Sequence, residues 1–187
     1  MPRAALTKDD LREQLWTLLT TEKVARFPGA RGRIPNFIGA EAAAKRLAAL
    51  PEWRAARTIK CNPDAPQLPV RVLALREGKR LFVAVPRLRE ERCFLELDPR
   101  RLAGRERAAA SIRGAAMFGT PTLPRDMPAI DLIVAGSVAV GRDGARTGHE
   151  KMAIGLRSIA PARAQRLVAM LVEPFRAAAD EPGVTPT

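Results

Sequence analysis

The sequence predicts an α/β layer structure with a largely parallel sheet, on two observations. Short apolar runs of strand length, separated by proline, glycine and charged residues, alternate with stretches of helical periodicity. The run from Ile130 to Val134 is the clearest, and its nearly continuous apolar character is typical of a strand buried on both faces. Alternation of this kind favours parallel strands that are connected by helices.

The length of the chain fits one folded domain. Its 187 residues are enough for one well-buried core and too few for two large domains. We therefore expect a single domain over residues 1–180 and a frayed tail over residues 181–187. No apolar run approaches the roughly 20 residues that span a bilayer, and residues 1–10 lack the apolar core of a secretory signal. These features predict a cytoplasmic protein, and a monomer is our default expectation.

Helix and loop signals alternate over the first fifty residues. Thr7 suits an N-cap, and leucines recur behind it at helical spacing, which predicts an amphipathic helix over residues 8–22. The proline- and glycine-rich segment 27–39 predicts an ordered loop. Residues 40–49 are rich in alanine and predict a helix that ends near Pro51.

The middle of the chain is predicted to contain several strands. Residues 58–61, 70–75 and 81–85 are short apolar runs, and we expect each to be a strand. A helix is expected near residues 105–117, and apolar residues at helical spacing predict another over residues 163–179.

Three loops follow predicted strands, at residues 62–67, 86–89 and 141–148. Because ligands collect at the carboxyl ends of parallel strands, we expect these loops to converge on one edge of the sheet. The last loop has glycines that permit tight turns, and Arg142 and Arg146 add cations that suit a phosphate-bearing ligand. On local grounds alone, an ordinary strand followed by a solvated turn is the simpler interpretation.

The net charge indicates an anionic partner. The formal charge is +12, which fits a nucleotide, a polyglutamylated cofactor or a nucleic acid. Cys61 and Cys93 have no metal-ligand spacing, and we expect both to be small buried apolar residues. His149 is the only histidine, which excludes His-rich metal sites.

Several motifs together carry a family resemblance. They are the pair Lys8 and Arg12 on the first helix, the strand and proline in GKRLFVAVPRL, and the segment DLIVAGSVAVGRDGARTG. The chain resembles the 5-formyltetrahydrofolate cyclo-ligase family, also called methenyltetrahydrofolate synthetases, over most of residues 7–148. GRIPNFIGAEAAA, KCNPDAPQLPVR and IRGAAMFGTP are similar to a branch of synthetase-domain-containing proteins. The resemblance implies a three-layer Rossmann-like fold, with a largely parallel sheet flanked by helices.

The resemblance also implies an activity. The family converts 5-formyltetrahydrofolate to 5,10-methenyltetrahydrofolate with ATP and magnesium, a ligase reaction of folate one-carbon metabolism. A formamide is a poor electrophile, and the family is thought to phosphorylate its oxygen so that a neighbouring folate nitrogen can attack and phosphate can leave. Positioning and charge neutralisation dominate phosphoryl transfer, so cations and magnesium matter more than a nucleophilic side chain. The implied partner is the folate, with or without a polyglutamate tail.

The resemblance assigns residues to the two parts of the implied site, the part that binds ATP and the part that binds the folate. Lys8 and Arg12 are four residues apart, which places them on one helical face, although by spacing alone such a pair is an ordinary solvated face. The implied ATP contacts are Lys8, Arg12, Arg142, Gly144, Arg146 and Gly148. The family uses an acidic residue after its second strand, and Asp64 is the nearest one here. With Asp64, the candidates for the folate end are Gln67 and Arg33.

The chain departs from the family pattern after Gly148. The family continues with glycines, tyrosine and an aspartate associated with the metal, whereas residues 149–154 read HEKMAI and the chain has no tyrosine. Glu150 is the remaining candidate for the metal. The alternatives to a working enzyme are a folate- or nucleotide-binding protein without ligase chemistry, and an RNA-associated protein. The RNA hypothesis is less favoured because only 4% of the residues are aromatic. A shifted reading frame near residue 149 would produce the same departure.

Overall fold

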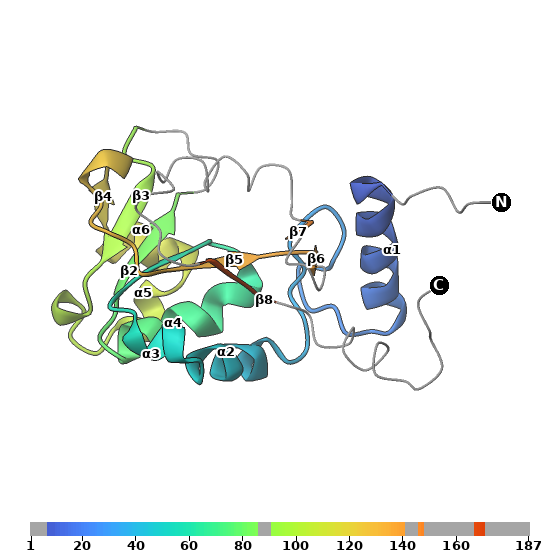
Figure 1. Cartoon of the computed structure of the whole chain (residues 1–187), viewed down its shortest axis with the longest axis horizontal. Helices are drawn as coiled ribbons and strands as arrows, with labels where there is room; N and C mark the ends of the chain where they lie inside the picture. The colour runs from blue at the N-terminus through green and yellow to red at the C-terminus, as the bar shows by residue number, and fades with distance from the viewer. Residues whose placement is uncertain (1–6, 86–90, 141–145, 148–166, 171–187) are drawn as a thin grey trace.

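A six-stranded sheet forms the centre of the part of the chain that the structure describes (Figure 1). The structure is a computed structural model, and it describes residues 7–85, 91–140, 146–147 and 167–170. The strands of the sheet are β1 (Thr58–Cys61), β2 (Arg80–Ala84), β3 (Phe94–Leu97), β4 (Thr120–Thr122), β5 (Leu132–Gly136) and β8 (Leu167–Met170). Their order across the sheet is β4-β3-β2-β1-β5-β8.

The strand directions are mixed but mostly parallel. β1 is parallel to both β2 and β5, and β5 is parallel to β8. β3 is antiparallel to β2 and to β4. Three of the five neighbouring pairs are therefore parallel, and the predicted α/β fold with a largely parallel sheet flanked by helices is confirmed. A separate antiparallel pair is formed by β6 (Ala139–Val140) and β7 (Arg146–Thr147).

The two helices that the sequence predicts in the first fifty residues begin and end close to their predicted bounds. The helices of the described residues are α1 (Lys8–Thr21), α2 (Ala40–Ala48), α3 (Pro51–Ala55), α4 (Leu68–Arg76), α5 (Glu106–Ala109) and α6 (Ile112–Phe118). Thr7 caps α1 in a reciprocal arrangement: its backbone N–H donates to Asp10 Oδ2 at 3.0 Å, and the Asp10 N–H donates to Thr7 Oγ1 at 3.1 Å. Both predicted N-terminal helices are confirmed.

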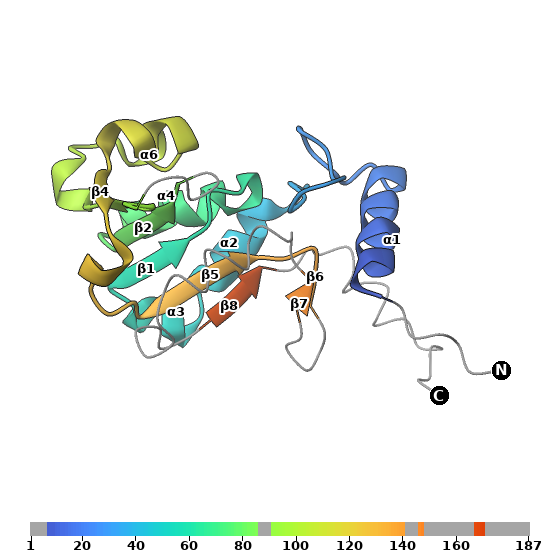
Figure 2. The ribbon, with the colours of Figure 1, turned by 90° about the horizontal axis from the view of Figure 1, so that it is seen from above.

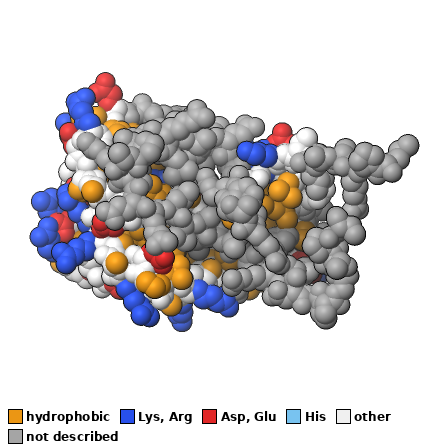
Figure 3. Space-filling model, in the orientation of Figure 1, with side chains coloured by type: hydrophobic (Ala, Val, Ile, Leu, Met, Phe, Trp, Pro, Cys, Tyr) orange, Lys and Arg blue, Asp and Glu red, His pale blue; other side chains and the backbone are white. Residues whose placement is uncertain are grey.

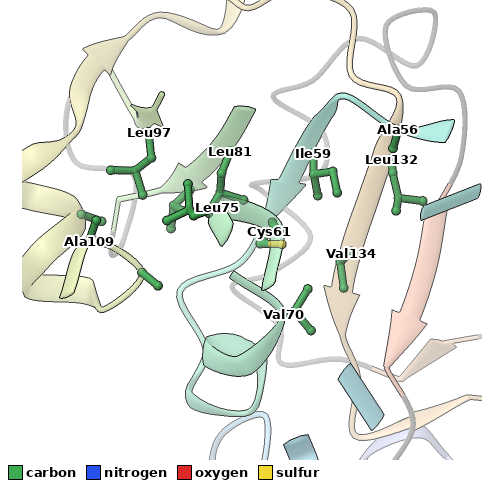
Figure 4. Close-up of a cluster of buried hydrophobic side chains, with 14 of the residues drawn as sticks. Ala56, Ile59, Cys61, Val70, Leu75, Leu81, Leu97, Ala109, Leu132 and Val134 are labelled. Atoms are coloured by element: carbon green, nitrogen blue, oxygen red, sulfur yellow. The ribbon is translucent and has the colours of Figure 1, made fainter. Parts of the chain in front are cut away.

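The larger core lies between one face of the sheet and the helices α2, α4, α5 and α6. Figure 4 shows Ile59 and Cys61 of β1 and Leu132 of β5 on this face, with Val70 of α4. Residues of a strand alternate between its two faces, so the intervening residue of β1, Lys60, faces the other side of the sheet.

Both cysteines are buried, as predicted. Burial raises the pKa of the Cys61 thiol to about 12, although the positive charges of Arg71 and Lys60 act in the opposite direction. Burial also raises the pKa of Cys93. Both thiols are therefore protonated near neutral pH and behave as small apolar groups.

Residues 70–75 were expected to form a strand, and this prediction is wrong, because they lie in α4. A proline in the first turn suits a helix start, and the buried residues Val70, Arg71, Ala74 and Leu75 recur at helical spacing. A short apolar run has the same composition in a strand and in a buried helix, so composition alone did not distinguish them.

Two helical predictions in the second half also need correction. The expected helix near residues 105–117 is two short helices: α5 ends with Ala110 as its C-cap, and Ser111 caps α6 by accepting a hydrogen bond from the Gly114 N–H at 2.9 Å. Residues 167–170, expected within a helix over 163–179, form β8 and pair with β5. The rest of that predicted helix lies outside the described residues. Within the described residues, no helix is long and apolar enough to cross a membrane.

Candidate functional site

The carboxyl ends of the parallel strands define one edge of the sheet. β1 and β5 both point toward α1 and the β6–β7 pair (Figure 2). The predicted loop 62–67 follows β1 at this edge, and its residues meet the end of β5 there. The other two predicted loops, 86–89 and 141–148, lie mostly outside the described residues.

A network of buried polar groups fixes the loop after β1. The Asn62 N–H donates to Gln67 Oε1 at 3.0 Å, and Gln67 Nε2 donates to Asp64 Oδ2 at 3.3 Å. Gln67 is fully buried, in a short 3-10 helix that runs into α4. The Asp64 carboxylate, which is half-buried, is therefore held in one orientation by a rigid neighbour.

Arg71 holds the same loop from α4. It is 2% exposed, and its Nη1 donates to the carbonyl oxygens of Asn62 at 2.6 Å and Asp64 at 3.0 Å. Its Nε donates to the carbonyl oxygen of Ala110 at 2.7 Å. Burial lowers the pKa of Arg71, while Cys61 and Asp64 act in the opposite direction. A guanidinium remains charged at neutral pH, so the edge of the sheet contains a fixed cation beside Asp64.

Gly136, the last residue of β5, leaves the space into which this loop packs. A Cβ added at Gly136 would lie 3.0 Å from both Asp64 Oδ2 and Gln67 Nε2. It would also lie 2.9 Å from Ile34 Cγ2. The segment 27–39 thus reaches the same point through Ile34, and a larger residue at 136 would force these side chains to shift.

The neighbouring residue Arg33 is placed differently from Ile34. Its backbone carbonyl accepts a hydrogen bond from Trp16 Nε1 of α1 at 3.0 Å, whereas its side chain is exposed and its Nε donates to the Arg31 carbonyl at 3.4 Å. The structure therefore brings Ile34 to Asp64 and Gln67 and anchors Arg33 to α1. A contact of the Arg33 side chain with a ligand stays a prediction.

The candidate nucleotide residues lie on α1 and on the hairpin beside it. Lys8 is exposed, and Arg12 is half-buried and forms an ion pair with Asp9. α1 contacts both β6 and β7, and Arg146 belongs to β7 (Figures 1 and 2). Contacts of Lys8, Arg12 and Arg146 with the phosphates of a nucleotide stay predictions. The candidates Arg142, Gly144, Gly148 and Glu150 lie outside the described residues.

The metal assignment gains no support from the rest of the site. No three His, Cys, Asp or Glu side chains of the described residues lie together in a way that would hold a metal ion. A Mg²⁺ site at Glu150 therefore stays a prediction.

The surface charge is partly neutralised. Lysine and arginine side chains gather at the end of the protein away from α1, where acidic side chains lie among them (Figure 3). Arg100 pairs with Asp98 at 2.8 Å, and Arg80 pairs with Glu96 at 2.5 Å. Such pairs are already counted in the net charge of +12, which fits any anionic partner and does not single out a nucleic acid.

The fold and the site together define an α/β protein that holds polar side chains at the carboxyl edge of its sheet. The model of the 5-formyltetrahydrofolate cyclo-ligase family matches residues 4–151, and the chain belongs to this family. The resemblance found in its motifs is thereby confirmed.

Relatives support the same assignment. The chain is similar to methenyltetrahydrofolate synthase domain-containing proteins. The protein of Bos taurus is 41% identical over 150 residues, which are 79% of this chain and 39% of the relative. The protein of Mus musculus is 40% identical over 146 residues, 76% of this chain and 39% of the relative. The protein of Homo sapiens is 35% identical over 151 residues, 79% of this chain and 39% of the relative. The chain spans about two fifths of the length of these relatives.

One group in this region was not predicted. Lys60 lies inside the apolar run of β1, is 1% exposed, and donates from Nζ to Asn62 Oδ1. A lysine between two apolar residues of a predicted buried strand is the signal that would have found it, because such a residue is rarely buried without a polar partner. The packing at Gly136 had no comparable signal, since it depends on contacts between distant segments.

Proposed function

We propose that the protein converts 5-formyltetrahydrofolate to 5,10-methenyltetrahydrofolate in an ATP- and Mg²⁺-dependent reaction, as a ligase of folate one-carbon metabolism. One observation carries the proposal: Asp64, Gln67 and Ile34 meet at Gly136, at the carboxyl edge of a sheet whose chain belongs to the cyclo-ligase family. A cytoplasmic monomer is part of the same proposal.

The folate end of the proposed site is made by Asp64, Gln67 and Ile34. The ring of a reduced folate has N–H donors, for which the Asp64 carboxylate is a suitable acceptor. Gln67 holds that carboxylate in place, and its own position is fixed by the Asn62 N–H. Ile34 is buried and packs beside Gly136 at this point, and the Arg33 side chain is proposed to reach the same end.

The nucleotide end is proposed to be made by Lys8 and Arg12 together with Arg142, Gly144, Arg146 and Gly148, with Glu150 as the residue that would hold Mg²⁺. ATP supplies a phosphoryl group that turns the formyl oxygen into a leaving group. The cationic side chains neutralise the phosphates and orient them, and the glycines allow backbone N–H groups to approach. In this division of roles, no side chain of the protein has to act as a nucleophile.

A folate-binding protein without turnover is the second candidate, and a specific observation favours it. The family match ends at residue 151, inside the segment 149–154 where the chain lacks the family's glycines and aspartate. Without these residues, backbone contact with the phosphates and a metal ligand are lost.

The test is the absorbance of the methenyl product, followed while the purified protein is mixed with 5-formyltetrahydrofolate, ATP and Mg²⁺. Growth of the band that requires ATP supports the proposed enzyme. A flat trace, from protein that is folded and binds folate by calorimetry, favours the second candidate. A folded protein that neither binds folate nor turns it over refutes both.

A further inference from the structure

Lys60 places a cation in the middle of the sheet. It pairs in register with Phe82 of β2 and Ile133 of β5, and it is 1% exposed. Its neighbours Ile59 and Cys61 face the main core, so its side chain lies on the opposite face (Figure 4). An ammonium group loses its hydration on burial, which is unfavourable unless polar groups replace the water.

The Asn62 side chain supplies such a group. Lys60 Nζ donates a hydrogen bond to Asn62 Oδ1, and both side chains lie on one face because the residues are two apart on an extended chain. A hydrogen bond from a charged donor is stronger than a neutral one. The amine therefore fixes the rotamer of Asn62 at the carboxyl edge.

Asn62 is the point at which the chain leaves the sheet. The pairing of β1 with both of its neighbours ends at Cys61, so the backbone of Asn62 is held by side chains rather than by a strand. Its N–H donates to Gln67 Oε1 at 3.0 Å, and its carbonyl oxygen accepts from Arg71 Nη1 at 2.6 Å. These are the two residues that also hold Asp64, by its side chain and its backbone respectively.

We propose that Lys60 is a positioning residue for the folate end of the site. By holding the side chain of Asn62, it keeps the backbone of that residue in the position from which Gln67 and Arg71 orient Asp64. The inference rests on the proposed function, because Asp64 is assigned to the folate there. It deepens the assignment by separating the two ends: the network reaches Asp64 and Gln67, whereas the nucleotide candidates Lys8 and Arg12 stand on α1.

A second lysine provides a matched control. Lys79 is 7% exposed, and its Nζ donates to the carbonyl oxygens of Trp53 at 2.8 Å and Ala56 at 2.9 Å. It directly precedes β2, so it lies at the amino edge of the parallel strands, opposite to the site. Lys79→Met removes the same charge from a similarly buried position without touching the carboxyl edge.

The experiment measures the dissociation constants of 5-formyltetrahydrofolate and of ATP by calorimetry, together with the melting temperature, for the full chain. The variants are Lys60→Met, Asn62→Ala, their double variant and Lys79→Met. We expect Lys60→Met to weaken folate binding at least tenfold and to leave ATP binding within twofold. Lys79→Met should lower the melting temperature with folate binding unchanged.

The double variant shows whether Lys60 acts through Asn62. If it does, the double variant binds folate no more weakly than Lys60→Met alone, because the second substitution removes a partner that is already lost. Should Lys60→Met fail to fold, Asn62→Ala carries the same expectation for folate and ATP.

The outcomes separate the inference from the proposed function. Wild-type protein that binds folate, with Lys60→Met or Asn62→Ala binding it equally well, overturns the inference alone. Equal weakening of folate and ATP, or additive effects in the double variant, also overturns it, since a general loss of structure explains both. Folded wild-type protein that binds no folate overturns the proposed function, and the inference with it.

Discussion

Replacing Gly136 with alanine should damage the folate end of the site in a measurable way. The new Cβ would lie 2.9 Å from Ile34 Cγ2 and 3.0 Å from both Asp64 Oδ2 and Gln67 Nε2, well inside ordinary van der Waals contact. Gln67 is fully buried and accepts a hydrogen bond from the Asn62 N–H at 3.0 Å, so any shift of its side chain strains that hydrogen bond. The clash therefore falls on the groups that are proposed to bind folate.

The magnitude follows from the packing. Adding a methyl group to a well-packed site typically costs 1–3 kcal/mol, so we expect a loss of about 2 kcal/mol. If this whole free-energy cost is taken from ligand binding, the affinity for folate falls by about 30-fold. Calorimetry with 5-formyltetrahydrofolate measures this change, and thermal unfolding measures the part that appears as lost stability.

Gly78→Ala is the matched control for this substitution. Nothing lies within 4 Å of a Cβ added at Gly78, but its φ of +75° is a conformation that alanine adopts only with strain. This variant should lose about 1 kcal/mol of stability and keep its folate affinity. If Gly136→Ala binds folate as tightly as the wild-type protein, the reasoning that places the ligand beside Asp64 and Gln67 is refuted.

Three further predictions test other parts of the structure. Lys8→Ala and Arg12→Ala should each raise the Kd for ATP by roughly tenfold with folate binding unchanged, because each removes a charged phosphate contact; unchanged ATP binding in both removes the assignment. Arg71→Met should cost about 3 kcal/mol by leaving two buried carbonyl oxygens and one partly buried one without their donor, a drop of roughly 10 °C in Tm; a smaller drop than for an exposed Arg76→Met would contradict this role. Cys61 should resist thiol reagents at pH 8 until the protein unfolds, because its pKa is raised to about 12. Since its unfolded pKa is near 9.0, the unfolded state loses this proton first, and Cys61 should lower stability as the pH rises from 9 toward 12. Cys61→Ala, followed by thermal unfolding, should remove that part of the pH dependence.

The helices and strands that were predicted correctly are determined by local features of the sequence. The helix α1 follows from the cap at Thr7 and the leucine spacing, and β1 and β5 follow from short apolar runs between turn residues. Residues 70–75 and 167–170 were assigned wrongly because a short apolar run is compatible with either type of element. Their structure depends on tertiary partners, which local propensity does not contain.

Part of the candidate site could also be predicted from local features of the sequence. Asp64 and Gln67 follow β1, so the expectation that this loop lies at the carboxyl edge of the sheet is confirmed, whereas their binding of a ligand stays a prediction. Asp64, Gln67 and Ile34 all approach Gly136, which joins three segments that are far apart in the chain, and no local pattern encodes this packing. The bond between Lys60 and Asn62 is local, and the lysine between two apolar residues of a predicted strand is its signal in the sequence.

The intrinsic fluorescence of Trp16 can report ligand binding. The chain has two tryptophans, and Trp53 is enclosed at the other end, where its Nε1 donates to Glu77 Oε2 at 2.7 Å. Trp16 instead joins α1 to the Arg33 carbonyl, one residue from Ile34. Any ligand that shifts α1 against this loop changes the surroundings of the Trp16 indole. A Trp53→Phe protein would therefore carry a single fluorophore at the junction of the two proposed half-sites, so titrating one ligand in the presence of the other would reveal the order in which they bind.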